Sequence, residues 1–182
     1  MKICIDPGHG MSNKRSGIYD SGAVYKNTQE STIAMDWANE LKAQIELLGH
    51  SAIRTRINEN DPCPVTRRDD IARSYKCDRM ISLHCNCANG KASGSEVFYR
   101  GNDDKEMAMK LSEIVSSILG IKNRGAKTEN ESQHTSLAVM EFDKCWLIEI
   151  GFIDNEFDRN QMLNKNIISK CCKELAKAIT SI

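Results

Sequence analysis

Two histidines and one glutamate of this sequence stand at or just after short runs of apolar residues. His9 lies between two glycines in "DPGHG", shortly after the run "KICI". His84 ends the stretch "RMISLH", and Glu149 stands inside "CWLIEI". In open α/β sheets, ligands bind beyond the carboxyl ends of the strands. Side chains that reach this edge from three different strands therefore predict a single site.

Each of these residues also has a purely structural interpretation. His9 could decorate a tight turn, although glycine neighbours also let the backbone approach a ligand closely. His84 could be a buried histidine at a strand end that bonds a backbone carbonyl. Glu149 is the hardest to explain in this way, because a carboxylate among apolar residues is unfavourable unless it is paired or bound to a metal.

Glu30 is a fourth candidate, and its local sequence allows two roles. Asn27 and Glu30 have the spacing of a capping box, in which the glutamate closes the first turn of a helix. A carboxylate at the rigid start of a helix can also bind a metal. The local sequence does not separate these two roles.

Zinc chemistry would use all four side chains together. His9, His84 and Glu30 would supply two neutral imidazoles and one carboxylate, which leave a fourth position open for water, as in catalytic zinc sites. Bound zinc lowers the pKa of its water to about 7. Glu149 would then serve as the general base and later as the acid.

An alternation of strands and helices must position these residues. We expect six strands, at 2–6, 52–55, 80–84, 95–99, 137–140 and 145–150. We expect helices at 30–48, 64–75 and 105–119, and a helical C-terminus with an apolar face formed by Ile168, Cys171, Leu175 and Ile179. Residues 121–136 are predicted to form a polar loop, with His134 exposed to solvent. The pattern predicts an α/β domain with a largely parallel sheet.

Composition and charge narrow the class of protein. The 182 residues fit one domain, and 25 lysines and arginines balance 25 aspartates and glutamates, so no long-range field favours a nucleic acid. The eight cysteines do not match a paired C-x-x-C zinc pattern, and we expect them to be reduced, structural thiols. A thiol nucleophile at Cys85 or Cys87, beside His84, is the alternative.

Motifs along almost the whole chain resemble those of the zinc-dependent N-acetylmuramoyl-L-alanine amidases, and they occur in that family's order. They are "KICIDPGHG", "DSGAVYKNTQE", "TR" at 55–56, "RRDDIA", "ISLHCN", "SGSEVFY", "NRGAK" and "LIEIGFIDN". The resemblance implies that His9, Glu30 and His84 bind one zinc ion and that Glu149 is the catalytic carboxylate. It also implies one amidase catalytic domain over residues 1–182, with a mixed, mostly parallel twisted sheet of about six strands flanked by helices on both faces.

The implied reaction is hydrolysis of the amide between N-acetylmuramic acid and L-alanine, so peptidoglycan is the expected partner, without nucleic acid or membrane insertion. "MKICIDPGHG" has no apolar signal-peptide core. We therefore expect a phage endolysin that is made in the host cytoplasm, acts on the cell wall after release, and lacks its C-terminal wall-binding domain here. The alternatives are a bacterial autolysin, a sporulation or germination amidase, a zinc peptidase that cuts stem-peptide bonds, and a wall-binding module without activity.

Overall fold

A six-stranded sheet lies at the centre of the computed structural model, which describes residues 1–131 and 137–181. The strand order is β6-β1-β7-β10-β8-β9, and every neighbouring pair is parallel except β10 and β8. The strands are β1 Lys2–Pro7, β6 Ser51–Arg54, β7 Arg79–Asn86, β8 Ser95–Tyr99, β9 Asn123–Thr128 and β10 Cys145–Phe152. The predicted α/β domain with a mixed, mostly parallel sheet is confirmed.

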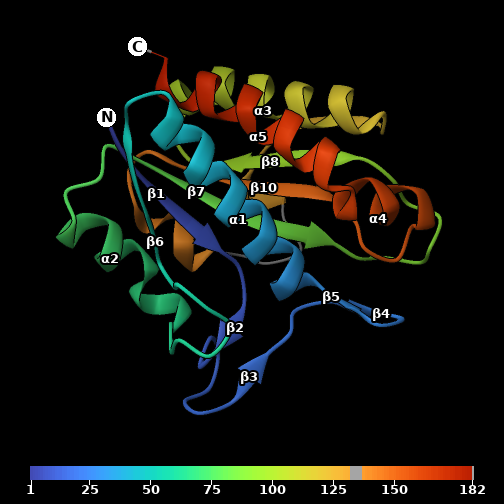
Figure 1. The fold of residues 1–182 in the computed structure, drawn as a ribbon, viewed down its shortest axis with the longest axis horizontal. Coiled ribbons are helices and arrows are strands. Elements are labelled where there is room, and N and C mark those ends of the chain that lie inside the picture. The colour runs from blue at the N-terminus through green and yellow to red at the C-terminus, as the bar shows by residue number, and fades with distance from the viewer. Residues whose placement is uncertain (132–136, 182) are drawn as a thin grey trace.

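Helices cover both faces of this sheet, but unequally (Figure 1). They are α1 Glu30–Leu47, α2 Arg68–Ser74, α3 Lys105–Leu119, α4 Glu156–Leu163 and α5 Lys165–Thr180. On one face, α1, α3 and α5 pack together and enclose the larger apolar core. On the other face, α2 contributes Ala72 to a smaller core.

Short elements complete the fold around the carboxyl ends of the strands and at the rim of the sheet. They are the strands β2 Gly10–Met11, β3 Tyr19–Asp20, β4 Val24–Tyr25 and β5 Thr28–Gln29, and the 3-10 turns η1 Val65–Arg67, η2 Asn102–Asp104, η3 Glu129–Glu131 and η4 Ala138–Glu141. The pairs β2-β3 and β4-β5 lie between β1 and α1 in the chain. They therefore shape the segment between His9 and Glu30.

The apolar residues whose spacing predicts the helices are buried in the structure. The apolar stripe of α1 is at most 1% exposed at Ile33, Trp37, Leu41 and Ile45. α3 ends at Gly120, whose φ of 68° a residue without Cβ adopts easily. The two long helices predicted there are confirmed to within one residue at their ends.

Two predictions for the chain between α3 and β10 are wrong. The polar stretch 121–136, expected to be a loop, contains β9. β9 is an edge strand in which every residue is at least partly exposed, so it needs no alternating apolar pattern. The segment 137–140, expected to be a strand, joins none of the sheets of the described chain and contains the turn η4 instead. Its apolar residues Val139 and Met140 still reach the smaller core. His134 lies outside the described residues.

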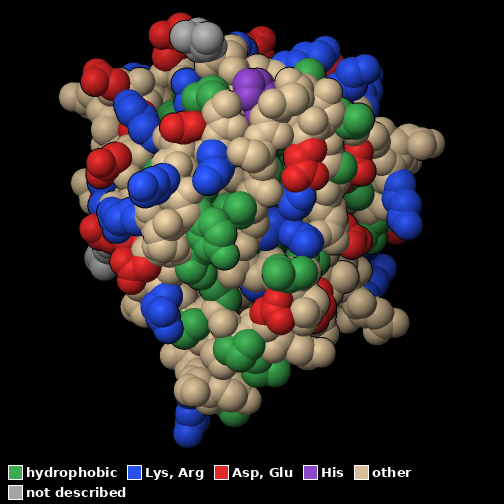
Figure 2. All heavy atoms as spheres, turned by 60° about the vertical axis from the view of Figure 1, so that its left-hand side comes forward, with side chains coloured by type: hydrophobic (Ala, Val, Ile, Leu, Met, Phe, Trp, Pro, Cys, Tyr) green, Lys and Arg blue, Asp and Glu red, His purple; other side chains and the backbone are tan. Residues whose placement is uncertain are grey.

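Charged side chains of both signs are interspersed on the face that Figure 2 shows. This distribution agrees with the balanced totals of acidic and basic residues. Charges that are mixed in this way produce little long-range field. Within the described part of the chain, no helix is both long enough and apolar enough to cross a membrane.

Candidate active site

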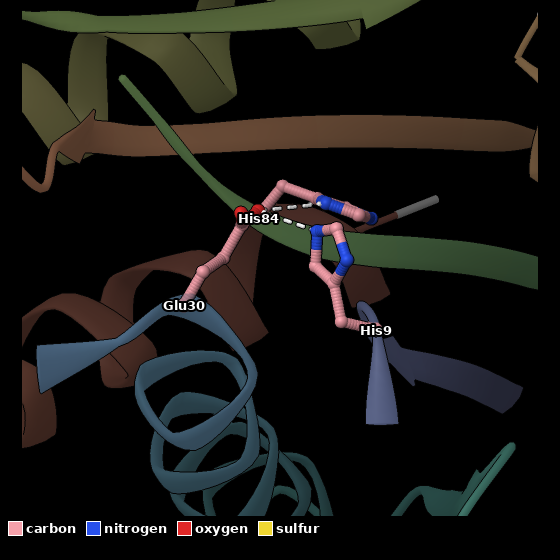
Figure 3. Close-up of side chains that lie close together, drawn as sticks. All are labelled: His9, Glu30 and His84. Carbon is pink, nitrogen blue, oxygen red and sulfur yellow. Dashed lines mark hydrogen bonds and ion pairs between the residues drawn. The ribbon is translucent and has the colours of Figure 1, made fainter. Parts of the chain in front are cut away.

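His9, Glu30 and His84 come together at the carboxyl edge of the sheet, from three separate elements (Figure 3). His9 follows β1, Glu30 is the first residue of α1, and His84 lies near the end of β7. One nitrogen of each imidazole and one carboxylate oxygen all lie within 4.8 Å of one another. The side chains predicted as metal ligands are therefore neighbours, in an arrangement that can hold one metal ion.

The Glu30 carboxylate is the centre of this cluster. Its Oε1 lies 3.0 Å from Nε2 of His9 and 3.0 Å from Nδ1 of His84, and it accepts a hydrogen bond from the N–H of Cys85. Its Oε2 accepts a 2.9 Å hydrogen bond from the N–H of Ala23. Burial would raise the pKa of Glu30, but the two imidazoles outweigh burial and hold this pKa well below its usual range. The carboxylate is therefore ionised and held in place.

The capping box considered for Glu30 is not formed. The N-cap residue of α1 is Gln29, and no side chain caps the helix. The Glu30 carboxylate instead reaches across to β7, where it meets His84 and the N–H of Cys85. Its negative charge also lies at the positive end of the α1 dipole, which stabilises it.

Two glycines give the imidazoles the space that they occupy. His9 itself has a left-handed φ of 62°, which is uncommon for a residue with a side chain. A Cβ atom on Gly8 would lie 2.4 Å from the ring of His84. A Cβ atom on Gly22 would lie 2.6 Å from Oε2 of Glu30 and from Cδ2 of His9. Gly8 and Gly22 therefore leave room for the side chains of the cluster that a larger residue would displace.

Asp20, on β3, orients His9 from the side away from Glu30. Its Oδ2 lies 3.1 Å from Nδ1 of His9 and accepts a 2.7 Å hydrogen bond from Nδ2 of Asn13. A carboxylate on the far nitrogen fixes the tautomer and the ring orientation, as is usual for metal-binding histidines. Burial would lower the pKa of His9, but Glu30 and Asp20 together raise it. Sequence reasoning missed Asp20, although it begins the "DSG" motif.

A buried arginine ties together the two segments that carry His9 and Glu30. Arg56 is only 1% exposed and follows β6 in the chain. Its guanidinium donates hydrogen bonds of 2.9–3.0 Å to the carbonyl oxygens of Pro7, Gly8 and Ser31. The turn after β1 and the first turn of α1 are therefore joined through one side chain.

A second buried arginine, Arg68 at the start of α2, holds the same turn from another side. It donates hydrogen bonds to the carbonyl oxygens of Pro7 and His9 and forms an ion pair with Asp6. Burial would raise the pKa of Asp6, but Arg68 and two hydroxyl groups outweigh burial and lower it. Both arginines lie in the motifs "TR" and "RRDDIA", to which sequence reasoning assigned no role.

Glu149 lies beside the cluster, in the middle of the sheet. On β10 it is the register partner of His84 on β7 and of Glu96 on β8. Its Oε2 is buried and has no hydrogen-bond partner within the residues that the structure describes. Burial, helped by Glu30 and Glu96, holds the pKa of Glu149 well above its usual range. A buried, unpartnered carboxyl beside a ligand cluster is typical of a functional acid or base.

The cluster and Glu149 line one cavity of about 720 Å³. A cavity of this size accommodates a substrate fragment rather than an ion alone. Phe98 and Phe152 supply apolar wall, whereas Asn86 lines the cavity without reaching the cluster. The Asn86 amide instead donates a 2.8 Å hydrogen bond to Glu96. Sequence reasoning missed Glu96, which stands in the "SGSEVFY" motif.

The alternative of a thiol nucleophile finds no support at this edge of the sheet. Cys85 is buried, and its burial together with Glu30 and Glu149 raises the pKa of its thiol well above the usual value. Cys87 is exposed, but partial burial and the nearby Asp154 raise its pKa as well. A reactive cysteine needs a lowered pKa. All eight cysteines of the chain are free thiols in the structure.

An α/β fold with a His/Glu/His cluster and a buried carboxyl in one cavity beyond its strand ends is typical of metal-dependent hydrolases. The family model of the N-acetylmuramoyl-L-alanine amidases matches residues 3–181. The chain belongs to this family of amidases.

Relatives and solved structures agree with this assignment. The "Probable cell wall amidase LytH" of Staphylococcus saprophyticus is 30% identical over 185 residues, which cover 98% of this chain and 58% of that protein. The N-acetylmuramoyl-L-alanine amidase LytC of Bacillus subtilis is 28% identical over 168 residues, 88% of this chain and 31% of LytC. The chain thus spans less than two thirds of both relatives. The catalytic domain of the amidase CwlV from Bacillus (Paenibacillus) polymyxa shares the fold, with a TM-score of 0.83, 20% identity, and coverage of 98% of this chain and 96% of that one.

Proposed function

We propose that residues 1–182 are the catalytic domain of a zinc-dependent N-acetylmuramoyl-L-alanine amidase. The domain would hydrolyse the amide between N-acetylmuramic acid and L-alanine in bacterial peptidoglycan. The observation that carries this proposal is the convergence of His9, Glu30 and His84 beside Glu149, in a cavity that can hold a substrate. The buried Oε2 of Glu149 has no hydrogen-bond partner among the described residues. Membership of the amidase family supports the choice of reaction.

The donor set of the cluster fits zinc. Two imidazoles and one carboxylate from separate elements correspond to the three-ligand sets of catalytic zinc sites. The Asp20 carboxylate on Nδ1 of His9 is the kind of outer partner that zinc-binding histidines usually have. When bound, zinc would polarise the scissile carbonyl and lower the pKa of water.

Glu149 would move the protons of the reaction. Its position next to His84 on the adjacent strand allows Oε2, which has no partner among the described residues, to take a proton from the attacking water. The same carboxyl would then deliver a proton to the leaving amine of L-alanine. Burial raises the pKa of Glu149, so its carboxylate is a stronger base toward the attacking water than an ordinary glutamate would be.

The biological setting belongs to the proposal as well. The relatives include a cell wall amidase of Staphylococcus saprophyticus and a sporulation-specific amidase of Bacillus subtilis, which favour a bacterial autolysin or sporulation amidase. A phage endolysin for host lysis is the second setting. In both, the domain would act on the cell wall after export or release, and a separate wall-binding domain would increase its affinity.

Digestion of purified peptidoglycan, with and without a zinc chelator, tests the proposed reaction. We expect new L-alanine amino termini without new reducing sugar ends, and we expect chelation to abolish activity and added zinc to restore it. New amino termini on other stem residues would instead indicate a peptidase. Activity that persists under full chelation would contradict the zinc proposal.

A pair of histidine variants tests the metal ligands directly. His84→Ala should lose bound zinc, as measured by elemental analysis, because it removes one of three ligands. His50→Ala is the matched control, since His50 follows α1 and contacts the N-terminal amine. Equal zinc content in the two variants would show that His84 is not a ligand.

A further inference from the structure

One wall of the cavity carries two cations that share a single buried carboxylate. Glu96 is 4% exposed and accepts hydrogen bonds from Nε of Arg124 at 2.6 Å and from Nζ of Lys127 at 2.5 Å. The cations belong to the edge strand β9, which pairs with β8 and so places them beside Glu96. All three side chains line the cavity of the proposed active site. Arg124 and Lys127 thus place two positive charges beside one buried carboxylate.

The guanidinium of Arg124 is held by Glu96, yet part of it has no partner among the residues that the structure describes. Its Nε is bonded to Glu96, and its Cζ lies 5.0 Å from the centre of the Phe152 ring. Its two terminal nitrogens make no hydrogen bond to residues 1–131 or 137–181. A held guanidinium whose terminal N–H groups are free is well suited to bind a carboxylate through two hydrogen bonds.

The position of Arg124, Lys127 and Glu96 in the sheet determines which residue of a bound peptide they can contact. His84, Glu149 and Glu96 are register partners on the neighbouring strands β7, β10 and β8. Because adjacent strands lie about 4.8 Å apart, the strand of Glu96, whose carboxylate binds both cations, is about 10 Å from the strand of His84. An extended peptide advances about 3.5 Å per residue. The wall therefore meets a bound peptide about two or three residues beyond the scissile amide.

We propose that Arg124 and Lys127 form a subsite for a free carboxylate of the stem peptide, with Glu96 as the residue that positions both cations. This inference rests on the proposed amidase function. In unamidated stem peptides, the glutamate after L-alanine is linked through its side chain and keeps a free α-carboxylate, so it is the acidic group nearest the cleaved bond. Glu131, another acidic residue that lines the cavity, has its carboxylate bonded to Thr128.

The subsite is tested with two muramoyl pentapeptides that differ only in an α-carboxylate or an α-carboxamide on that glutamate. For the zinc-loaded protein, kcat/KM should be about ten-fold higher for the acid than for the amide, as expected for one charge-assisted interaction. Arg124→Gln should remove most of this preference, and Arg124→Lys should keep part of it. Lys122→Gln is the matched control, because it makes the same charge change at an exposed side chain just before β9, and it should keep the full preference.

Equilibrium binding separates the subsite from the amidase reaction, because it requires no turnover. Calorimetric titration would compare the tripeptide L-Ala-γ-D-Glu-L-Lys with its α-amide. Tighter binding of the acid by about ten-fold, lost in Arg124→Gln and kept in Lys122→Gln, would support the subsite. Equal affinities would overturn it, even if both muramoyl peptides are cleaved. Tighter binding of the acid without cleavage of either substrate would keep the subsite and contradict the proposed reaction.

Discussion

The two halves of the proposed active site are built in opposite ways. In the held half, formed by His9, Glu30 and His84, the side chains bond to one another and to the protein around them. In the open half, formed by Glu149, Glu96, Arg124 and Lys127, Oε2 of Glu149 and the terminal nitrogens of Arg124 have no partner among the described residues. The first half is completed by the fold, whereas the second leaves polar groups available to a ligand.

This difference assigns separate tasks to the two halves. Two buried arginines and Asp20 fix the side chains and the turn of the held half. The held half therefore determines where a metal would bind. The open half faces the cavity with groups that can exchange protons or bind a carboxylate. Changes in the held half should therefore alter metal affinity and stability, and changes in the open half should alter turnover and substrate choice.

Glu149→Gln should have the largest effect on turnover. Loss of a general acid and base should lower kcat by about 10³-fold. The zinc content and the melting temperature should be unchanged or slightly higher, because a buried carboxyl without a partner is removed. Kinetics on peptidoglycan and elemental analysis measure the two parts. A variant that loses zinc together with turnover would place Glu149 in the held half and break the comparison.

Asp6→Asn should have the largest effect on stability. It leaves the buried Arg68 without its ion-pair partner, which should lower the free energy of unfolding at pH 7 by about 3 kcal/mol. Arg68 and two hydroxyl groups lower the pKa of Asp6 in the folded protein below the usual value of an aspartate. Its contribution to stability is therefore complete above that usual value and is lost as the pH falls from there toward the lower pKa of the folded state.

Urea unfolding over a series of pH values measures this effect. The difference between the wild type and Asp6→Asn should shrink as the pH approaches about 3, where the wild-type carboxyl also becomes protonated in the unfolded chain. Asp143→Asn, at an exposed position after η4, is the control and should unfold like the wild type. A constant difference at all pH values would mean that the charge of Asp6 is not what stabilises the fold.

Arg56→Met should lower the zinc affinity by about 10- to 100-fold, in the range seen for residues that orient metal ligands. The variant loses the hydrogen bonds that join the turn after β1 to the first turn of α1. Arg56→Lys should restore part of the affinity, because it keeps the positive charge and one donor nitrogen in place of three. Competition with a zinc chelator measures the affinity, and kcat at saturating zinc should change much less than the affinity does. A fall in kcat alone would contradict a holding role.

Asp20→Asn should have the smallest effect among these variants, a loss of zinc affinity of about ten-fold. The amide can still accept a hydrogen bond from Nδ1 of His9, but it lacks the charge that raises the pKa of this imidazole. Zinc titration with the wild type as reference measures the change. An unchanged affinity would show that the orientation of His9 is already determined by the backbone of its turn.

The residues that could do chemistry were easier to predict from the sequence than the residues that hold them. His84 and Glu149 are conspicuous because each ends or interrupts an apolar run, and His9 because it stands between two glycines shortly after such a run. Arg56 and Arg68 donate largely to backbone carbonyls, which every residue has, so no pattern of side chains reveals their partners. Their positions depend on the tertiary fold.

Prediction of the fold from the sequence also failed at one polar element, the edge strand β9. The buried strands and the long helices follow from apolar spacing, since their side chains fill a core. β9 has a single neighbour and partly exposed residues, so its sequence "NRGAKT" carries no such spacing. The cations of the open half lie on this strand. For this reason the sequence predicted the proposed metal ligands but not the proposed carboxylate subsite.

The position of β10 has a consequence for the order in which the molecule can assemble. β10 is the last strand in the chain but lies between β7 and β8, so β6-β1-β7 and β8-β9 are joined only when β10 inserts between them. Pairings between distant segments form slowly, because a long loop must close first. Glu149 arrives on this strand. Completion of the sheet by β10 therefore brings Glu149, the proposed proton-transfer group, beside His84, and the proposed activity requires this pairing between distant segments.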